Sequence, residues 1–391
     1  MELTFLDPVY AGPGPYACAY LDTSRDVPDP EAAISLRRRH LREDLAGQGA
    51  ADTTVAVVAD VAGTDREVSG RHGQAIVASH GCLVLVEELP KPPAHDAARF
   101  GALPDLMPLA VQHAPDIPYV AAIVHRVAHP EAGEPEDREV DFQTGRWPGS
   151  AVAPERRHRR SGPAEWPYGA DEIAGELAEL VRRSGAEVIV LGGEAWARNV
   201  LANRLPEPLR ERVVTVAGDG QAAGEGRALL EQELGEVFRG RMSARVQARV
   251  EAFRARRARH AGAVEGMAAV VAALQRAQVS ALLLNTPVDL PVRLWAGSEP
   301  TQIALSATDL ESFGVLGFQE DPPGAALIRA LVRTGAELVV VAREELPLED
   351  RGACCCGTPT RRCPGDPPSP GRSCHTVAGS ACRREELVRY A

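Results

Sequence analysis

The residues best suited to chemistry in this sequence are arginines gathered in two clusters. The denser cluster holds Arg156, Arg157, His158, Arg159 and Arg160 in immediate succession. A guanidinium group donates two parallel hydrogen bonds to a phosphate, so such a run can clamp a nucleic-acid backbone. The alternative is a solvated run whose charge is offset by neighbouring glutamates, and charge alone favours that alternative.

The second cluster is longer and less dense. Residues 239–259 contain eight arginines against a single acidic residue, Glu251. Arg241, Arg245 and Arg249 are spaced four residues apart, so a helix would align them on one stripe. This stripe can face RNA, although a solvated face in an arginine-rich protein explains the same pattern equally well.

The sequence contains no motif for a nucleophile, a cofactor or a metal. Gly192 and Gly193 follow a predicted strand and open a predicted helix, where a phosphate can bind. The G-x-G-x-x-G spacing is absent and Glu194 would repel an anion, which favours a plain turn. Metal-ligand residue types occur near the C-terminus, but their gaps match no tight zinc spacing, so we expect neither metal nor cofactor. These residues are Cys363, Cys374, His375 and Cys382.

Composition restricts the possible partners. The net charge is −11, and among the 43 basic residues only Lys91 is a lysine. An anionic chain is not attracted to nucleic acid as a whole, so any RNA contact must come from a local basic patch. Neither a membrane-spanning stretch nor a secretory signal is recognisable, and we expect a cytoplasmic protein.

Apolar strands alternate with amphipathic helices, which predicts an α/β protein with mixed sheets flanked by helices. We interpret residues 129–167, which are rich in proline, glycine and charge, as mostly loop or irregular hairpin. The expected strands cover 54–59, 73–78, 83–87, 119–125, 188–191, 213–217, 280–284 and 337–341, with short extended pieces at 294–296 and 303–305. The expected helices cover 28–46, 171–184, 195–204, 227–260, 264–276 and 325–334.

The order of these elements predicts three domains and a tail. The expected domains are an N-terminal α/β domain over 1–114, a central domain over 115–225 with a long basic loop, and a C-terminal α/β domain over 226–350. Residues 351–391 lack apolar periodicity and predict an irregular tail. Because composition changes abruptly there, we hypothesise that a frameshift replaced the native C-terminus after about Arg351.

The order of short sequence blocks resembles the bacterial members of the archaeo-eukaryotic peptide chain release factor family. Its actinobacterial branch includes relatives of the ribosome hibernation factor Balon. The resemblance covers about residues 1–350 and implies a three-domain release-factor-like architecture. The blocks that carry it lie at residues 70–78, 117–124, 188–193, 205–213, 282–284, 294–295, 334–341 and 345–348.

In classical release factors, the central domain carries a Gly-Gly-Gln loop that positions water against the peptidyl-tRNA ester, a proximity effect. The equivalent loop here spans about residues 146–168 and contains no glutamine; the nearest is Gln143. No stop-codon-reading motif is recognisable in the first domain. The resemblance therefore implies a ribosome-binding shape without termination activity.

We accordingly expect a translation factor that binds the ribosome in or near the A site, for hibernation or rescue. The arginines at 156, 157, 159 and 160 would contact rRNA or the tRNA acceptor region. The arginines at 241, 245 and 249 would contact RNA or a translation factor. Elongation factor Tu is a partner implied by the resemblance alone. Two alternatives stay open: a peptidyl-tRNA hydrolase of ribosome quality control that uses Gln143 or His158, and a small-molecule-binding α/β protein.

Overall fold

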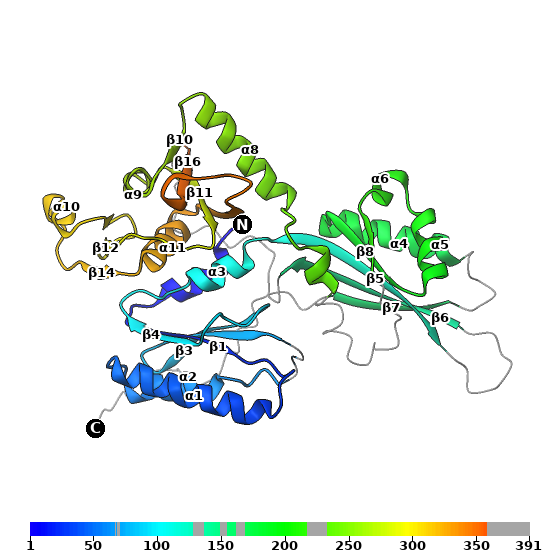
Figure 1. Cartoon of the computed structure of the whole chain (residues 1–391), viewed down its shortest axis with the longest axis horizontal. Coiled ribbons are helices and arrows are strands. Elements are labelled where there is room, and N and C mark those ends of the chain that lie inside the picture. Colours follow the sequence, from blue (N-terminus) through cyan, green and yellow to red (C-terminus); the bar gives the residue numbers. More distant parts are fainter. Residues whose placement is uncertain are drawn as a thin grey trace, which may run out of the picture.

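A computed structural model gives the fold and describes residues 1–66, 68, 71–127, 137–148, 155–161, 169–216 and 233–357. The N-terminal and C-terminal lobes lie together, and a central lobe projects away from them (Figure 1). Every lobe combines sheet and helices, which confirms the predicted α/β class with mixed sheets flanked by helices. Within the described ranges, no helix is long and apolar enough to cross a membrane.

The N-terminal lobe is an antiparallel sheet in the order β3-β2-β1-β4, with a core on each face. Alternate residues of its third strand in that order, residues 16–22, face opposite sides: Ala17 and Ala19 pack on two helices, whereas Cys18 and Tyr20 face the C-terminal lobe. The elements are η1 (Thr4–Ala11), β1 (Tyr16–Asp22), α1 (Pro30–Gly47), α2 (Asp52–Val61), β2 (Gly73–Ser79), β3 (Cys82–Leu89), β4 (Ala97–Gly101) and α3 (Met107–His113).

The strand predicted over residues 54–59 is wrong, because this segment is helix α2. Thr54, Val55, Val58 and Ala59 are its buried residues, and this spacing places them on one helical face. The run of β-branched residues favours a strand locally, but packing of that face against the sheet and α1 decides for the helix. The predictions for α1, β2 and β3 are confirmed to within a few residues.

The central lobe is a five-stranded mixed sheet in the order β7-β6-β5-β8-β9. Strand β5 (Ile117–Val127) pairs in parallel with β8 (Val188–Gly193) and antiparallel with β6 (Asp137–Trp147). Its residues Val120, Ala122 and Val124 pack against the helices, while alternate residues face a second apolar cluster, so both faces are covered. The other elements are β7 (Glu155–Ser161), α4 (Gly169–Ser184), α5 (Ala195–Arg204), α6 (Glu207–Arg210) and β9 (Val213–Thr215).

The structure describes two strands within the segment 129–167. Residues 137–147 form β6 and residues 155–161 form β7, and their antiparallel pairing agrees with the hairpin that the sequence interpretation offered beside a loop. An edge strand pairs with a neighbour on one side only, and it can form without alternating apolar residues. The sequence of β7 therefore lacks the apolar/polar alternation by which strands are predicted.

The C-terminal lobe has a four-stranded sheet in the order β10-β16-β11-β15 and a smaller one in the order β13-β12-β14. The long helix predicted over 227–260 is interrupted: a short helix at 233–237 ends before a separate helix begins at Ala244, with Ser243 as its N-cap. The elements are α8 (Ala244–Ala258), β10 (Ala263–Glu265), α9 (Met267–Gln275), β11 (Val279–Thr286), β12 (Leu294–Ala296), β13 (Ile303–Ala304), α10 (Ala307–Ser312), β14 (Gln319–Asp321), α11 (Pro323–Thr334), β15 (Glu337–Ala342), η3 (Glu349–Arg351) and β16 (Gly352–Cys356).

Side-chain packing divides the chain differently from the predicted boundaries at 114 and 226. Leu234 and Phe238 pack on the central sheet beside Tyr119, so this segment belongs to the central lobe. One continuous apolar core joins the N-terminal lobe to the C-terminal lobe, and it includes Leu106 and Leu327. These two lobes therefore form one body in terms of their packing.

The first residues of the predicted irregular tail are a strand. Residues 352–356 form β16, which pairs antiparallel with both β10 and β11. Ala353, Cys354 and Cys355 are buried in this strand, where the cysteines act as small apolar residues. The remainder of the predicted tail, from residue 358, lies outside the described residues, and the frameshift hypothesis stays untested.

Gly193 joins β8 to α5 at a point where only glycine fits. Its φ is +89°, and a Cβ atom placed there would lie 1.9 Å from the carbonyl oxygen of Val124. The next amide, that of Glu194, donates a hydrogen bond of 3.0 Å to the same oxygen. The Gly-Gly pair therefore makes the close approach that starts α5, in agreement with the plain turn that the sequence favours.

We predict that Gly193→Ala lowers the free energy of unfolding by more than about 2 kcal/mol, because it adds both a backbone clash and a strained φ. The matched control is Gly175→Ala on the exposed face of α4, where the new methyl group meets no atom within 4 Å. This control should raise stability by up to about 1 kcal/mol. Urea unfolding of both variants measures the difference, and equal effects would contradict the role of Gly193.

Candidate nucleic-acid interface

The basic run of residues 156–160 lies on strand β7, at the edge of the central sheet. The backbone register sets Arg156, His158 and Arg160 opposite Gln143, Asp141 and Glu139, and sets Arg157 and Arg159 opposite Phe142 and Val140. Since neighbouring positions of a strand alternate between its faces, the run is divided between the two faces of the sheet edge.

Strand β7 ends the described part of the central sheet. It is the last strand of its sheet, with β6 as its neighbour in the order β7-β6-β5-β8-β9. In Figure 1, β6 and β7 extend along the part of the central lobe that points away from the other two lobes.

Arg146, at the root of the predicted functional loop, has a structural role. Its Nε donates a 2.5 Å hydrogen bond to the Asp116 carboxylate, and a terminal nitrogen donates to the Asp116 carbonyl at 3.2 Å. Asp116 is buried and directly precedes β5. The pair fixes the end of β6 to the start of β5, so Arg146 is not available for a ligand in this conformation.

Gln143, the nearest glutamine to the expected catalytic loop, lies within β6. Its amide nitrogen donates to the Tyr119 hydroxyl at 3.1 Å, and its side-chain oxygen is buried without a hydrogen-bond partner among the described residues. Phe238 covers the same sheet face, 5.6 Å from the ring of Tyr119 and 5.7 Å from that of Trp147. Gln143 is thus part of a packed aromatic layer on the sheet.

Arg245 and Arg249 lie on α8, one turn apart as predicted, but both are bound by a carboxylate. Arg249 donates to both carboxylate oxygens of Glu337, at 2.9 and 2.6 Å, and Arg245 donates to Glu337 at 2.8 Å and to Glu2 at 2.7 Å. The network holds α8 against β15. It consumes hydrogen-bond donors that the sequence interpretation assigned to RNA.

Glu337 is the residue that sequence reasoning missed in this network. It is 8% exposed, and burial raises its pKa, but hydrogen bonds from Arg249 and Arg245 outweigh that effect and lower the pKa to about 2. The one visible signal is an acidic residue at the head of the apolar strand Glu-Leu-Val-Val-Val. Its partners lie 88 and 92 residues away in the chain, which no local pattern can indicate.

Arg241 is not part of the predicted three-residue stripe, because α8 begins three residues after it. It is exposed, and it has no ion pair with another residue of the described part of the chain. Of the three predicted arginines in this cluster, it is the one whose guanidinium faces water freely. The predicted metal-ligand types, Cys363, Cys374, His375 and Cys382, lie outside the described residues.

Comparison with known proteins finds a family to which the central part of the chain is similar. Residues 118–259 match the model of bacterial archaeo-eukaryotic release factor family 2. This segment contains the sheet from β5 to β9, the basic run and α8. The match confirms the resemblance to this family that the sequence blocks indicate.

Relatives and solved structures extend the comparison over most of the chain. An uncharacterised protein of Mycobacterium tuberculosis, Rv2629, is 26% identical over 363 residues, which cover 88% of this chain and 93% of the relative. The crystal structure of Archaeoglobus fulgidus Pelota aligns with 13% identity over 73% of this chain and 79% of its own, at a TM-score of 0.35. Saccharomyces cerevisiae Dom34, a translation termination-like factor, aligns with 8% identity over 74% and 81%, at a TM-score of 0.33.

We predict that Glu337→Gln lowers the free energy of unfolding at pH 7 by about 3 kcal/mol, because two arginines lose their shared counter-charge. The pKa of Glu337 is depressed in the folded state, so its stabilisation is complete above about pH 4.5 and disappears as the pH falls toward 2. The difference between wild type and variant should therefore shrink over this acid range in chemical unfolding experiments.

Glu344→Gln is the matched control, since Glu344 is exposed and forms no ion pair with any residue in the described ranges. It should change the free energy of unfolding by less than about 0.5 kcal/mol at every pH. If the Glu337 variant behaves like this control, the arginines of α8 are not held by Glu337 in solution.

Proposed function

From the match of residues 118–259 to the bacterial archaeo-eukaryotic release factor family, we propose that this protein binds the ribosome in or near the A site through its central lobe. It acts in hibernation or rescue and does not terminate at stop codons. The family match is the observation that carries the proposal. Absence of a Gly-Gly-Gln sequence anywhere in the chain supports the exclusion of termination.

The proposed contact surface is the sheet edge formed by β7, with Arg156, Arg157, Arg159 and Arg160. Four arginines on one strand at the edge of a projecting lobe concentrate positive charge in a protein whose net charge is −11. Phosphate groups of rRNA or of a tRNA acceptor stem are the chemistry that such an edge recognises. His158 contributes a further hydrogen-bonding group to the same strand.

The second arginine cluster contributes fewer proposed RNA contacts than the β7 strand. Arg245 and Arg249 keep their Glu337 partner, and Arg241 is the candidate RNA contact of that cluster. Elongation factor Tu enters the proposal through the family resemblance alone, and its contact surface on this chain is left unassigned.

Of the two residues considered for a peptidyl-tRNA hydrolase, Gln143 and His158, the first gains no support from its described contacts. Water positioning needs a side chain that reaches a bound ester, whereas Gln143 is tied to Tyr119 within the sheet. We therefore propose binding without turnover.

We predict that the protein cosediments with ribosomes and that binding weakens steeply as salt increases, because phosphate contacts release counterions. Replacing Arg156, Arg157, Arg159 and Arg160 by alanine should reduce affinity for the ribosome at least tenfold. It should also make the negative slope of log K against log salt shallower by about 3. A sedimentation series at several salt concentrations gives both quantities.

The matched control replaces two exposed arginines of the same lobe, Arg182 and Arg183, whose charge is already shared with Glu179. This control should leave the slope unchanged. Failure of the wild-type protein to cosediment would remove the proposal, and hydrolysis of peptidyl-tRNA by the wild type that is lost in Gln143→Ala would establish the enzyme instead.

A further inference from the structure

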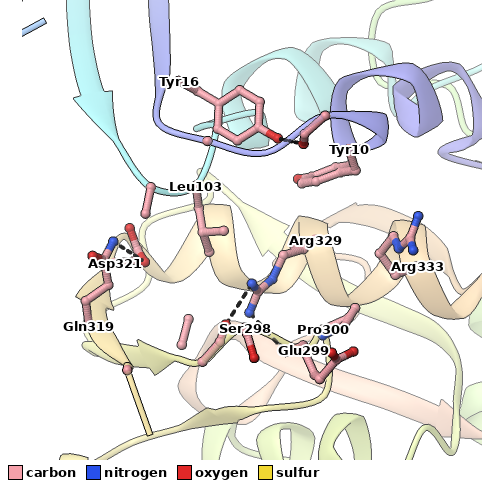
Figure 2. A pocket seen from close by; sticks show the side chains of 16 residues that line it. Tyr10, Tyr16, Leu103, Ser298, Glu299, Pro300, Gln319, Asp321, Arg329 and Arg333 are labelled. Carbon is pink, nitrogen blue, oxygen red and sulfur yellow. Dashed lines mark hydrogen bonds between the residues drawn. The ribbon is translucent and has the colours of Figure 1, made fainter. Parts of the chain in front are cut away.

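A cavity of about 430 Å³ lies between the N-terminal and C-terminal lobes, away from the β7 edge. Its N-terminal side is formed by η1, by the turn that leads into β1 and by the end of β4. Its C-terminal side is formed by α11, β14 and the turn at 297–300 that joins β12 to β13 (Figure 2). A volume of this size accommodates a small organic molecule.

Arg329 of α11 lines this cavity and is an unusual arginine. It is 7% exposed, although a guanidinium group stays charged at any physiological pH. Two of its terminal nitrogens donate to the carbonyl oxygens of Gly297 and Glu299, at 2.9 and 3.2 Å. Its Nε has no hydrogen-bond partner within the described structure.

No carboxylate forms an ion pair with Arg329 within the part of the chain that the structure describes, although Asp321 and Glu299 lie near enough to act on its charge. The nearby Asp321 is taken by Arg99 at 3.4 Å and by the side-chain amide of Gln319 at 3.1 Å. Burial lowers the pKa of Arg329, which shows how costly its charge is in this place. A buried positive charge bonded only to neutral carbonyl groups is compensated most effectively by an anion from outside the chain.

Two further side chains complete the surroundings of this charge. Arg333 lies one helical turn beyond Arg329 on α11, lines the same cavity and is exposed, without an ion pair to another described residue. The hydroxyl of Tyr10 is buried and has no hydrogen-bond partner among the described residues. Figure 2 shows Tyr10 facing the side of α11 that carries both arginines.

The rest of the lining limits what the ligand can be. Tyr10, Leu103 and Pro300 offer apolar surface, which fits an apolar or aromatic body. Glu299 and Asp321 also line the cavity and would repel a polyphosphate. The residues therefore match a small molecule with a single anionic group on an apolar body.

We propose that this cavity binds such a molecule. The carboxylate or phosphate of the ligand lies against Arg333 and Arg329 on α11, and the apolar body of the ligand lies against Tyr10. Both anions present the oxygen acceptors that guanidinium and hydroxyl donors require. The site is distinct from the proposed β7 contact surface, because none of its residues belongs to the central lobe.

Isothermal titration of the full-length protein with benzoate, phenyl phosphate and uncharged benzyl alcohol tests the proposal. We expect saturable binding of at least one anion and none of benzyl alcohol, and the preferred anion identifies the ligand as a carboxylate or a phosphate monoester. Arg333→Gln should weaken that binding about tenfold, because a hydrogen-bonded charge is lost at an exposed position that does not affect folding.

Arg343→Gln is the matched control, since Arg343 is an exposed arginine of the same lobe outside the cavity. Tyr10→Phe separates a ligand role from packing: it should weaken binding several-fold while keeping or raising the thermal midpoint of the unliganded protein, because it removes an unpartnered buried hydroxyl. Absence of binding by either anion, equal binding of benzyl alcohol, or unchanged affinity in Arg333→Gln would overturn the proposal.

Discussion

The need to provide each guanidinium group with a counter-charge or with water constrains this structure most. Arginine does not lose its proton at physiological pH, so burial always costs free energy unless a partner compensates it. Most described arginines near the surface meet this need inside the chain: Arg37 binds Asp22 and Asp96, and Arg245 and Arg249 share Glu337. Such pairing cancels positive charge locally, and the two proposed sites, the β7 edge and the cavity at Arg329, are separate from these pairs.

Packing determines where those sites lie. The N-terminal and C-terminal lobes share one apolar core and are also linked by the ion pairs Arg99–Asp321 and Arg245–Glu2. The central lobe has cores of its own on both faces of its sheet. The β7 edge is therefore carried by a separate body, whereas the cavity at Arg329 lies within the joined pair of lobes.

Sequence patterns predicted the elements whose own residues carry the signal. Helix α4 has an apolar stripe and strand β8 an apolar run, and both lie where expected. Strand β7 is absent from the predicted strands because an edge strand of arginines has no alternating apolar pattern. Helix α2 was predicted as a strand because its valines favour a strand when tertiary packing is ignored. At the candidate site, the arginine run was visible in the sequence. The Glu337 partner was not, since a contact across about ninety residues is set by the tertiary fold.

The two proposed binding sites would differ in their physical environment. In the proposal for the sheet edge of β7, arginine charges attract a polyanion through water, and such attraction is screened within about 10 Å at 0.1 M salt. At Arg329, the charge lies in the interior, where screening by salt is weak and an unpaired group is costly. The edge is suited to a large polyanion that releases counterions on binding, and the cavity to one small anion held by directed hydrogen bonds. The two proposed sites share neither residues nor a core, so the proposals do not require the two ligands to compete.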